Sequence, residues 1–328
     1  MKDTRENNSF FNKIYGITCK GRFGEHNARK EVYKENLKLF LNWKKGIDEI
    51  GLGDYNEFLD NTKLYSDYNN VNGIGKIYDN TKTGCIDADC VDVAEKLVEA
   101  GYNPAILNLA SAVKPSGGYK DGSSAQEESL CRSSNLSLSL YQYGNPKYIN
   151  VRESGVPNKK IAYPLDINYG GIYSKNVTFF RHNRNKYYYT LRKNVFKCGV
   201  ITVAALCFNG KSHYADLDEL SFRSESGGFT EEGEKIMLNK IRTIFRIGIE
   251  NGHDALVLGA FGCGAYKLLP SEVAPLFRRV MEESEFKNKF KYILFAILQK
   301  PSRKNMLDNK YAPFYNEFGE IIEFSLWD

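Results

Sequence analysis

The stretch that decides the fold runs from Ala105 to Tyr141 and reads AILNLASAVKPSGGYKDGSSAQEESLCRSSNLSLSLY. Its first five residues form an apolar run with the length of a buried strand. The middle, Pro115–Ser124, is rich in glycine, and the part from Gln126 to Tyr141 has a helical pattern. A strand that leads through a loop into a helix is the repeating unit of an α/β fold.

The same order recurs along the rest of the chain. The pattern predicts strands at Gly199–Cys207, Ala255–Gly259 and Lys291–Leu298, and helices at Val91–Ala100, Glu231–Glu250 and Ser271–Glu283. Thr230 is the expected N-cap of Glu231–Glu250, and Lys76–Asp79 is expected to end a strand. Strands that alternate with helices predict an α/β fold with a mixed, mostly parallel sheet and helices on both faces.

The first 75 residues differ from this pattern because they are polar, charged and weakly helical. Within them, Arg29–Leu41 has the spacing of an amphipathic helix, whose apolar face would carry Val32, Leu37, Phe40 and Leu41. The sequence therefore predicts a helical N-terminal extension over residues 1–75 and one α/β domain over residues 76–328.

The composition excludes several classes of protein. With 42% hydrophobic and 26% charged residues among 328, the chain is close to a globular average, which excludes a disordered chain. The longest apolar run, Gly199–Phe208, is too short to span a membrane, and the N-terminus lacks the apolar core of a signal peptide. We therefore expect a soluble, cytoplasmic protein without membrane contact. A net charge of only +5 does not favour general nucleic-acid binding.

Cysteine and histidine are scattered. The seven cysteines form no CxxC pair and the four histidines stand singly, so neither a zinc site nor a disulfide framework is expected. Most of the cysteines are expected to be buried apolar groups in a reducing compartment. Cys263 is the candidate if one cysteine is catalytic.

Two glycine-rich loops are the candidate binding elements. In parallel sheets, ligands bind where strands lead into helices, and both Asn108–Glu128 and Gly259–Tyr266 (GAFGCGAY) follow predicted strands. Gly117 and Gly118 let the backbone approach a ligand and present its N–H groups, and the start of a helix favours anions. Either loop alone could be a plain turn, but two of them facing each other would hold a diphosphate.

Two adjacent acids, Glu127 and Glu128, follow the first loop. Neighbours on a helix point about 100° apart, so one carboxyl could meet a bond being broken while the other holds a nearby hydroxyl. A glycosidic bond suits such a group, because protonation of the leaving oxygen assists its departure. The alternative is that both acids only complement the helix dipole.

These residues carry a resemblance. The run NLASAVKPSGGYKDGSSAQEESLCRSS, Asn108–Ser134, resembles the signature of microbial-type poly(ADP-ribose) glycohydrolases, a branch of the macrodomain fold with a three-glycine loop followed by Gln-Glu-Glu. VLGAFGCGAY, Val257–Tyr266, is similar to the second phosphate loop of that family. Weaker matches are GIYSKNVTFFR, Gly171–Arg181, and ITVAALCFN, Ile201–Asn209. The resemblance covers about residues 75–300.

The resemblance implies a hydrolase that cleaves the ribose–ribose O-glycosidic bonds of poly(ADP-ribose) on modified proteins and releases ADP-ribose. It makes Glu128 the catalytic acid/base, lets Glu127 hold ribose hydroxyls, and requires neither cofactor nor metal. The implied substrate-binding residues are Asn108, Ser111, Ser116, Gly117, Gly118, Tyr119, Gln126, Phe261, Gly262, Cys263, Gly264, Ala265 and Tyr266.

Ser116 departs from the family pattern because it stands where the first glycine is expected. A serine there costs little at negative φ with its Cβ pointing away, but it would crowd the site at positive φ or in contact with the ligand. The sequence therefore leaves open a non-catalytic ADP-ribose reader and a hydrolase of another ADP-ribosyl conjugate.

The stretch Arg181–Lys197 contains six basic residues, no acid and three consecutive tyrosines. Such a pattern suits a phosphate-rich chain with stackable bases. The alternative is a hairpin whose tyrosines pack on the sheet. The sequence leaves the oligomeric state open.

Overall fold

The computed structural model describes residues 21–184, 188–210, 213–299 and 309–321. The chain divides into two compact units. Unit 1 consists of Met1–Thr62, Lys114–Tyr163 and Asn176–Lys197, and unit 2 of Lys63–Val113, Pro164–Lys175 and Cys198–Asp328. These boundaries differ from the predicted division at residue 75, which stays a prediction.

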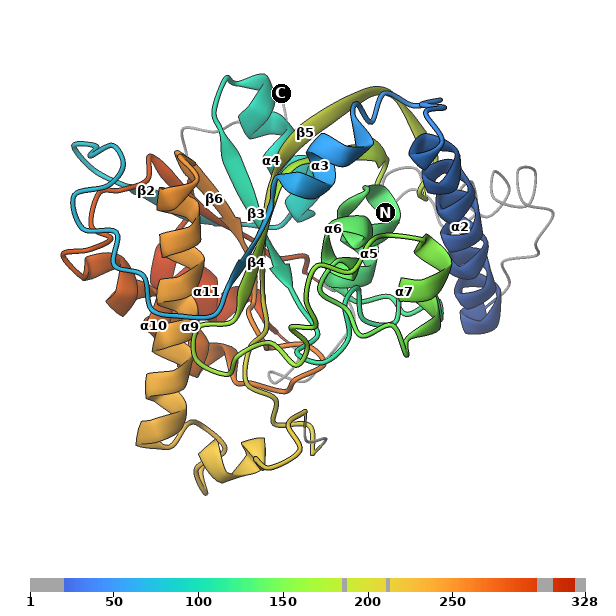
Figure 1. Ribbon diagram of the computed structural model, residues 1–328. Coiled ribbons are helices and arrows are strands. Elements are labelled where there is room, and N and C mark those ends of the chain that lie inside the picture. Colours follow the sequence, from blue (N-terminus) through green and yellow to red (C-terminus); the bar gives the residue numbers. More distant parts are fainter. Residues whose placement is uncertain (1–20, 185–187, 211–212, 300–308, 322–328) are drawn as a thin grey trace. The chain divides into compact units, whose positions relative to one another are not determined.

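A seven-stranded sheet has the order β1-β4-β5-β3-β6-β7-β2 (Figure 1). Its strands are β1 (Thr62–Tyr65), β2 (Lys82–Ile86), β3 (Pro104–Leu109), β4 (Gly171–Arg181), β5 (Leu191–Val203), β6 (Ala255–Leu258) and β7 (Tyr292–Ala296). The pairs β2–β7, β3–β5, β3–β6 and β6–β7 are parallel. The prediction of an α/β fold with a mostly parallel sheet is confirmed.

Strand β3 is hydrogen-bonded on one side to β5 and on the other to β6. Its residues are buried, with only Leu109 half-buried, which explains the continuous apolar run in the sequence. Asn108 pairs with Thr202 in the β3–β5 register, near the carboxyl ends of both strands. This position leads directly into the residues that follow β3, where the sequence predicts a binding site.

Unit 2 contains most of the sheet and its helices. These are α4 (Cys90–Glu99), the short 3₁₀ helix η1 (Glu219–Phe222), α9 (Glu231–Glu250), α10 (Pro270–Glu282) and α11 (Tyr311–Phe318). The Thr230 hydroxyl accepts a hydrogen bond from Gly233 N–H and caps α9, as predicted. The predicted helices α4, α9 and α10 and strands β3, β6 and β7 are each confirmed within two residues at either end.

Unit 1 contains α2 (Gly21–Lys44), α3 (Tyr55–Asp60), α5 (Gln126–Ser133), α6 (Leu136–Tyr141) and α7 (Ile149–Ser154). Helix α2 packs against α5 and α7 (Figure 1). The amphipathic helix predicted at Arg29–Leu41 is confirmed, and Val32 and Phe40 are buried on it, whereas Leu37 and Leu41 are half-buried. Its buried face also carries polar side chains, Arg29 and Asn36, that the apolar spacing did not indicate.

Three predicted elements are wrong in their extent. The expected helix Gln126–Tyr141 is two helices, because Ser134 has an extended backbone and forms an antiparallel bridge with Phe179. The strand expected at Gly199–Cys207 is β5, which begins at Leu191 and ends at Val203. Lys76–Asp79 does not end a strand, because β2 begins only at Lys82.

The basic stretch is largely structural where the structure describes it. Arg181 is buried and donates to Asn36 Oδ1, the Tyr189 carbonyl and Glu35. Tyr188 and Tyr189 are buried in a cluster with Ala28 and Val32, so they pack on helix α2, whereas the packing alternative placed the tyrosines on the sheet. Lys186 and Tyr187 lie outside the described residues.

The described part of the chain contains neither a candidate membrane-spanning helix nor a candidate metal site. None of its helices combines the length and the apolar character needed to cross a membrane. Its His, Cys, Asp and Glu side chains form no group of three or more that could hold a metal ion.

Candidate functional site

The acid pair lies at the start of α5 in unit 1. Glu127 and Glu128 occupy its first turn, where carboxylates complement the positive end of the helix dipole. Helix-dipole complements are ordinarily exposed, but these side chains are only 2% and 7% exposed. Burial of two neighbouring carboxyl groups costs free energy unless each has partners, so surface electrostatics alone do not account for their position.

The glycine loop holds one oxygen of Glu128. Gly118 N–H donates to Glu128 Oε1 at 2.8 Å. The other oxygen, Oε2, is buried and has no hydrogen-bond partner among the described residues. Glu128 is therefore held at one oxygen by the loop backbone, and its other oxygen accepts no hydrogen bond from the described residues.

Gly117 and Gly118 leave no room for a side chain. A Cβ on Gly117, where φ is +52°, would lie 2.5 Å from Glu128 Oε1 and 3.0 Å from Glu127 Oε2. A Cβ on Gly118 would overlap the Ser123 hydroxyl. Gly117 therefore permits the close packing of the loop backbone against both carboxyl groups, and Gly118 permits its close packing against Ser123. The predicted approach of this backbone to a ligand stays a prediction.

Other predicted residues of this loop turn their side chains into unit 1. Tyr119 is 1% exposed, accepts a hydrogen bond from Asn36 Nδ2 at 2.8 Å, and packs edge to face on Tyr33. Ser116 is fully buried and is hydrogen-bonded to Tyr141. If Ser116 and Tyr119 contact a substrate in this conformation, they do so through the backbone. Gln126, at the first position of α5, is half-buried.

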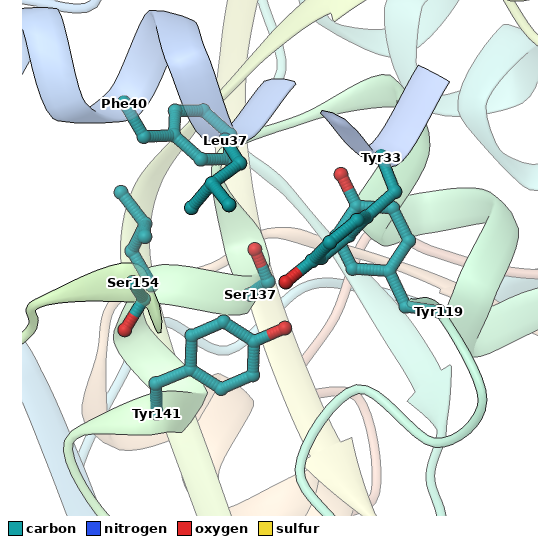
Figure 2. A pocket seen from close by; sticks show the side chains of 8 residues that line it. Tyr33, Leu37, Phe40, Tyr119, Ser137, Tyr141 and Ser154 are labelled. Atoms are coloured by element: carbon teal, nitrogen blue, oxygen red, sulfur yellow. The ribbon is translucent and has the colours of Figure 1, made fainter. Parts of the chain in front are cut away.

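A small cavity lies in the same unit, with room for about one water molecule. Figure 2 shows the rings of Tyr33 and Tyr119 packed edge to face, with the Tyr141 hydroxyl directed into the same space. The lining residues are Tyr33, Leu37, Phe40, Tyr119, Ser137, Leu138, Tyr141 and Ser154. A space of this size cannot take a nucleotide, so this cavity is not the predicted substrate site.

The second glycine loop follows β6 in unit 2. Gly262 has φ +74°, and a Cβ there would overlap the Leu268 side chain and lie 2.8 Å from Ala205 Cβ. Gly264 is open by comparison, since the nearest atom to its Cβ position is Lys310 Nζ at 3.6 Å. Ala265 is exposed. This loop therefore places the half-buried Gly264 and the exposed Ala265 beside a cation, which suits an anion.

Two predicted residues of the second loop point inward. Phe261 is fully buried and packs against Phe277. Cys263 is buried, its thiol donates to the Phe261 carbonyl, and burial raises the pKa of that thiol to about 12. A thiol held in its neutral form is a poor nucleophile, so Cys263 is placed for a structural role and not for covalent catalysis.

Tyr266, Asn108 and Ser111 complete the predicted set. Tyr266 is half-buried, and its hydroxyl accepts a hydrogen bond from Ala112 N–H at 2.9 Å. Asn108 is buried at the end of β3 and donates to Thr202 Oγ1 at 3.2 Å. Ser111 is half-buried two residues after the strand. Unit 2 thus brings the residues after β3 next to the second glycine loop.

Sequence reasoning missed two residues beside this loop. His213 packs its ring on Tyr266 with centroids 5.0 Å apart, and its Nδ1 lies 2.9 Å from the buried Glu219 carboxylate. Lys310 lies beside Gly264 although 46 positions separate them in the sequence. Both come from segments far from the loop along the chain and carry no local motif, so only folding identifies them.

The family comparison matches the region of the acid pair. Residues 44–182 match the family described as "Microbial-type PARG, catalytic domain". The predicted resemblance to microbial-type PARG is confirmed. The match includes the first glycine loop and α5, whereas α2, apart from its last residue, and the second glycine loop lie outside it.

The solved structures of PARG share the fold of this chain. The poly(ADP-ribose) glycohydrolase of Thermomonospora curvata has a TM-score of 0.65 at 23% identity, covering 89% of this chain and all of that one. The structure of the same enzyme bound to the inhibitor ADP-HPD has a TM-score of 0.63 at 23% identity, with the same coverage of both chains. The structure of PARG from Deinococcus radiodurans in complex with ADP-ribose has a TM-score of 0.57 at 23% identity, covering 81% of this chain and 96% of that one. No curated protein matches the sequence.

Proposed function

We propose that this chain is a poly(ADP-ribose) glycohydrolase, which cleaves ribose–ribose O-glycosidic bonds and releases ADP-ribose with Glu128 as general acid/base. The match of residues 44–182 to the microbial-type PARG catalytic domain supports this proposal. So does the fold shared with PARG structures that hold ADP-HPD or ADP-ribose.

The observation that carries the proposal is the geometry of Glu128. Its Oε1 is held by Gly118 N–H, and its buried Oε2 has no partner among the described residues. A carboxyl group in this state can give a proton to the leaving ribose oxygen as the glycosidic bond breaks. The carboxylate then takes a proton from the water that attacks the oxocarbenium-like carbon, which restores the acid.

The remaining predicted residues take binding roles in this proposal. Glu127, buried beside Gly117, holds ribose hydroxyls, and Gln126 supports the same region. The backbone of Gly117 and Gly118 contacts the diphosphate and the adjoining ribose. In unit 2, backbone N–H groups of Gly262–Ala265 bind phosphate, Tyr266 covers the proximal ribose, and Asn108 and Ser111 lie at the distal ribose.

The setting of the activity is also part of the proposal. The substrate is poly(ADP-ribose) attached to modified proteins, the fold is a branch of the macrodomain fold, and the protein acts in the cytoplasm. The six cysteines that the structure describes are all free and buried, which agrees with a reducing compartment.

The substitution Glu128→Gln tests the mechanism. It keeps the shape and the hydrogen bond from Gly118 N–H but removes the exchangeable proton, so we expect at least a ~10³-fold loss of kcat. Calorimetric binding of ADP-ribose should remain within about 3-fold of the wild type. The assay follows ADP-ribose released from poly(ADP-ribosyl)ated protein by chromatography.

Glu57→Gln, a matched change of an exposed carboxyl on α3 in the same unit, should leave both quantities unchanged. Full activity of Glu128→Gln would contradict the assigned role. A wild-type protein that binds ADP-ribose but releases none from the polymer or from other ADP-ribosyl conjugates would be a reader and not an enzyme.

A further inference from the structure

Ser116 has an unusual backbone for its residue type. Its φ is +62°, and the next residue, Gly117, has φ +52°. Glycine adopts this left-handed region freely, whereas a residue with a Cβ is strained there. Such strain persists only where the surrounding structure holds the residue in place. The conformation of Ser116 therefore requires an anchor.

The anchor is the side chain itself. Ser116 is fully buried, and its hydroxyl is hydrogen-bonded to the Pro115 carbonyl oxygen at 2.6 Å and to the Tyr141 hydroxyl at 2.9 Å. Asn150 Nδ2 donates to the Ser116 and Tyr141 hydroxyls at 3.5 and 3.4 Å. Tyr141 ends α6 and Asn150 belongs to α7, so this network ties the loop to two helices of unit 1.

The loop after Ser116 is held by hydrogen bonds between residues close together in the sequence. Tyr119 N–H donates to the Ser116 carbonyl at 3.1 Å, and Ser123 N–H to the Gly118 carbonyl at 3.1 Å. Gly118 N–H, between them, donates to Glu128 Oε1. A rotation about the Ser116 backbone would shift all of these donors, because each depends on the turn that Ser116 begins.

We infer that Ser116 is a positioning residue, whose hydroxyl, held by Tyr141 and Asn150, fixes the left-handed turn that sets Gly117 and Gly118 against Glu128. The inference deepens the proposed function and rests on it where substrate affinity is concerned. It also accounts for a serine at a position where glycine would relieve strain. Glycine would also allow this turn, but the loop would then be more mobile in the free protein. It would have to become ordered when the substrate binds, which lowers the affinity.

The test compares Ser116→Gly, Tyr141→Phe and the double variant with the wild type. Ser116→Gly fits the observed φ and so should fold, and Tyr141→Phe removes one hydroxyl without touching the loop backbone. Hydrogen–deuterium exchange of residues 117–123 in the free protein reports loop order without reference to any ligand. Exchange of these amides should be at least about 5-fold faster in each variant.

Substrate measurements supply a readout that a purely structural role would not move. In the variants, the loop should become ordered when the substrate binds, at a cost in binding free energy. KM and the calorimetric Kd for ADP-ribose should therefore rise about 5-fold. Once the loop is ordered the catalytic geometry is restored, so kcat should change less than about 2-fold. Because both substitutions break the same network, the Kd of the double variant should also rise about 5-fold, and not by ~25-fold, the product expected of two independent effects.

Two matched controls separate the anchor from general effects. Asn176→Gly relieves another non-glycine residue at positive φ, +55°, in an exposed position. Tyr55→Phe removes the hydroxyl of another buried tyrosine in unit 1. Neither should alter loop exchange or Kd.

The outcomes are distinguishable. Unchanged loop exchange and unchanged Kd in Ser116→Gly, with a wild type that binds ADP-ribose, would overturn the inference and assign loop order to other contacts. A wild type that binds no ADP-ribose would contradict the proposed function, while the exchange result would still decide the role of Ser116 in loop order.

Discussion

At the scale of the residue, the space around Gly118 is the sharpest constraint in the candidate site. A side chain there would meet the Cβ of Ser123 at 2.8 Å and overlap its hydroxyl, so the loop must move if Gly118 is replaced. Since Gly118 N–H also holds Glu128 Oε1, the same movement would release the Glu128 carboxyl group.

We therefore expect Gly118→Ala to weaken ADP-ribose binding by at least ~10-fold, or about 1.4 kcal/mol. The double variant Gly118→Ala with Ser123→Gly removes the obstructing atoms, which leaves Glu128 Oε1 at 3.6 Å as the next neighbour. It should recover most of the lost affinity in calorimetry. If the single variant binds like the wild type, the loop does not contact the ligand as proposed.

A second residue-scale prediction concerns Lys310. Its ammonium lies beside Gly264 in the second glycine loop, and its charge acts to lower the pKa of Cys263, although burial raises that pKa overall. A cation there would attract a phosphate bound to the loop. Lys310→Ala should weaken ADP-ribose binding about 3- to 10-fold and reduce the dependence of Kd on salt, whereas the exposed Lys287→Ala should change neither. If both variants bind ADP-ribose equally well, Lys310 does not contribute to the phosphate site.

At the scale of the element, α2 is a structural support for the first glycine loop. Arg29 Nε donates to the Gly122 carbonyl at 2.6 Å, and Asn36 Nδ2 donates to both the Tyr119 hydroxyl and the Arg132 carbonyl. Asn36 Oδ1 accepts from Arg181 Nε at 2.7 Å. One buried amide thus connects α2 with the loop, with α5 and with β4.

Replacement of Asn36 by alanine should therefore destabilise the protein strongly. It leaves a buried tyrosine hydroxyl and a guanidinium N–H without their partner, which we expect to cost about 3 kcal/mol in the free energy of unfolding. Urea denaturation followed by circular dichroism measures the loss. Asn42→Ala, on the same helix but with an exposed partner, Glu49, should cost less than about 0.5 kcal/mol. Similar stabilities of the two variants would mean that α2 is a dispensable addition.

At the scale of the whole molecule, the buried tyrosines make stability sensitive to alkaline pH. Burial raises the pKa values of Tyr55 and Tyr188 to about 12 and those of Tyr33 and Tyr119 further. In the unfolded chain a tyrosine titrates near its ordinary value of about 10. Unfolding therefore releases protons above pH 10, and the tyrosine contribution to stability is lost as pH rises from about 10 towards 12.

We expect the free energy of unfolding from urea titrations to fall between pH 9 and pH 11. In Tyr55→Phe the fall should be smaller, because one group with a raised pKa has been removed. At pH 8 this variant should be at least as stable as the wild type, since the buried Tyr55 hydroxyl has no hydrogen-bond partner among the described residues. An identical pH dependence in the two proteins would contradict this account.

The predictability of the fold follows from how local each signal is. Strand β3 was recognised from its continuous apolar run, and α9 was recognised because its apolar residues repeat with the period of a helix. The break between α5 and α6 was not, because it depends on the bridge from Ser134 to Phe179, 45 residues away. Helix α11 was missed for a similar reason, since it packs on β2, which lies far from it in the sequence. Strand β4 was also missed, although its neighbour in the sheet, β5, is the next strand in the chain.

The sequence by itself determined the α/β pattern, the two glycine loops and the adjacent acids, because these depend on residue type and short spacing. Only the tertiary structure decided that Gly118 holds one oxygen of Glu128 while the other has no hydrogen-bond partner in the part of the chain that the structure describes. It also decided that Tyr119 turns towards α2 and that Ser116 lies at positive φ with its hydroxyl hydrogen-bonded to Tyr141. The physical reason is that burial and hydrogen-bond partners are set by segments brought together from far along the chain.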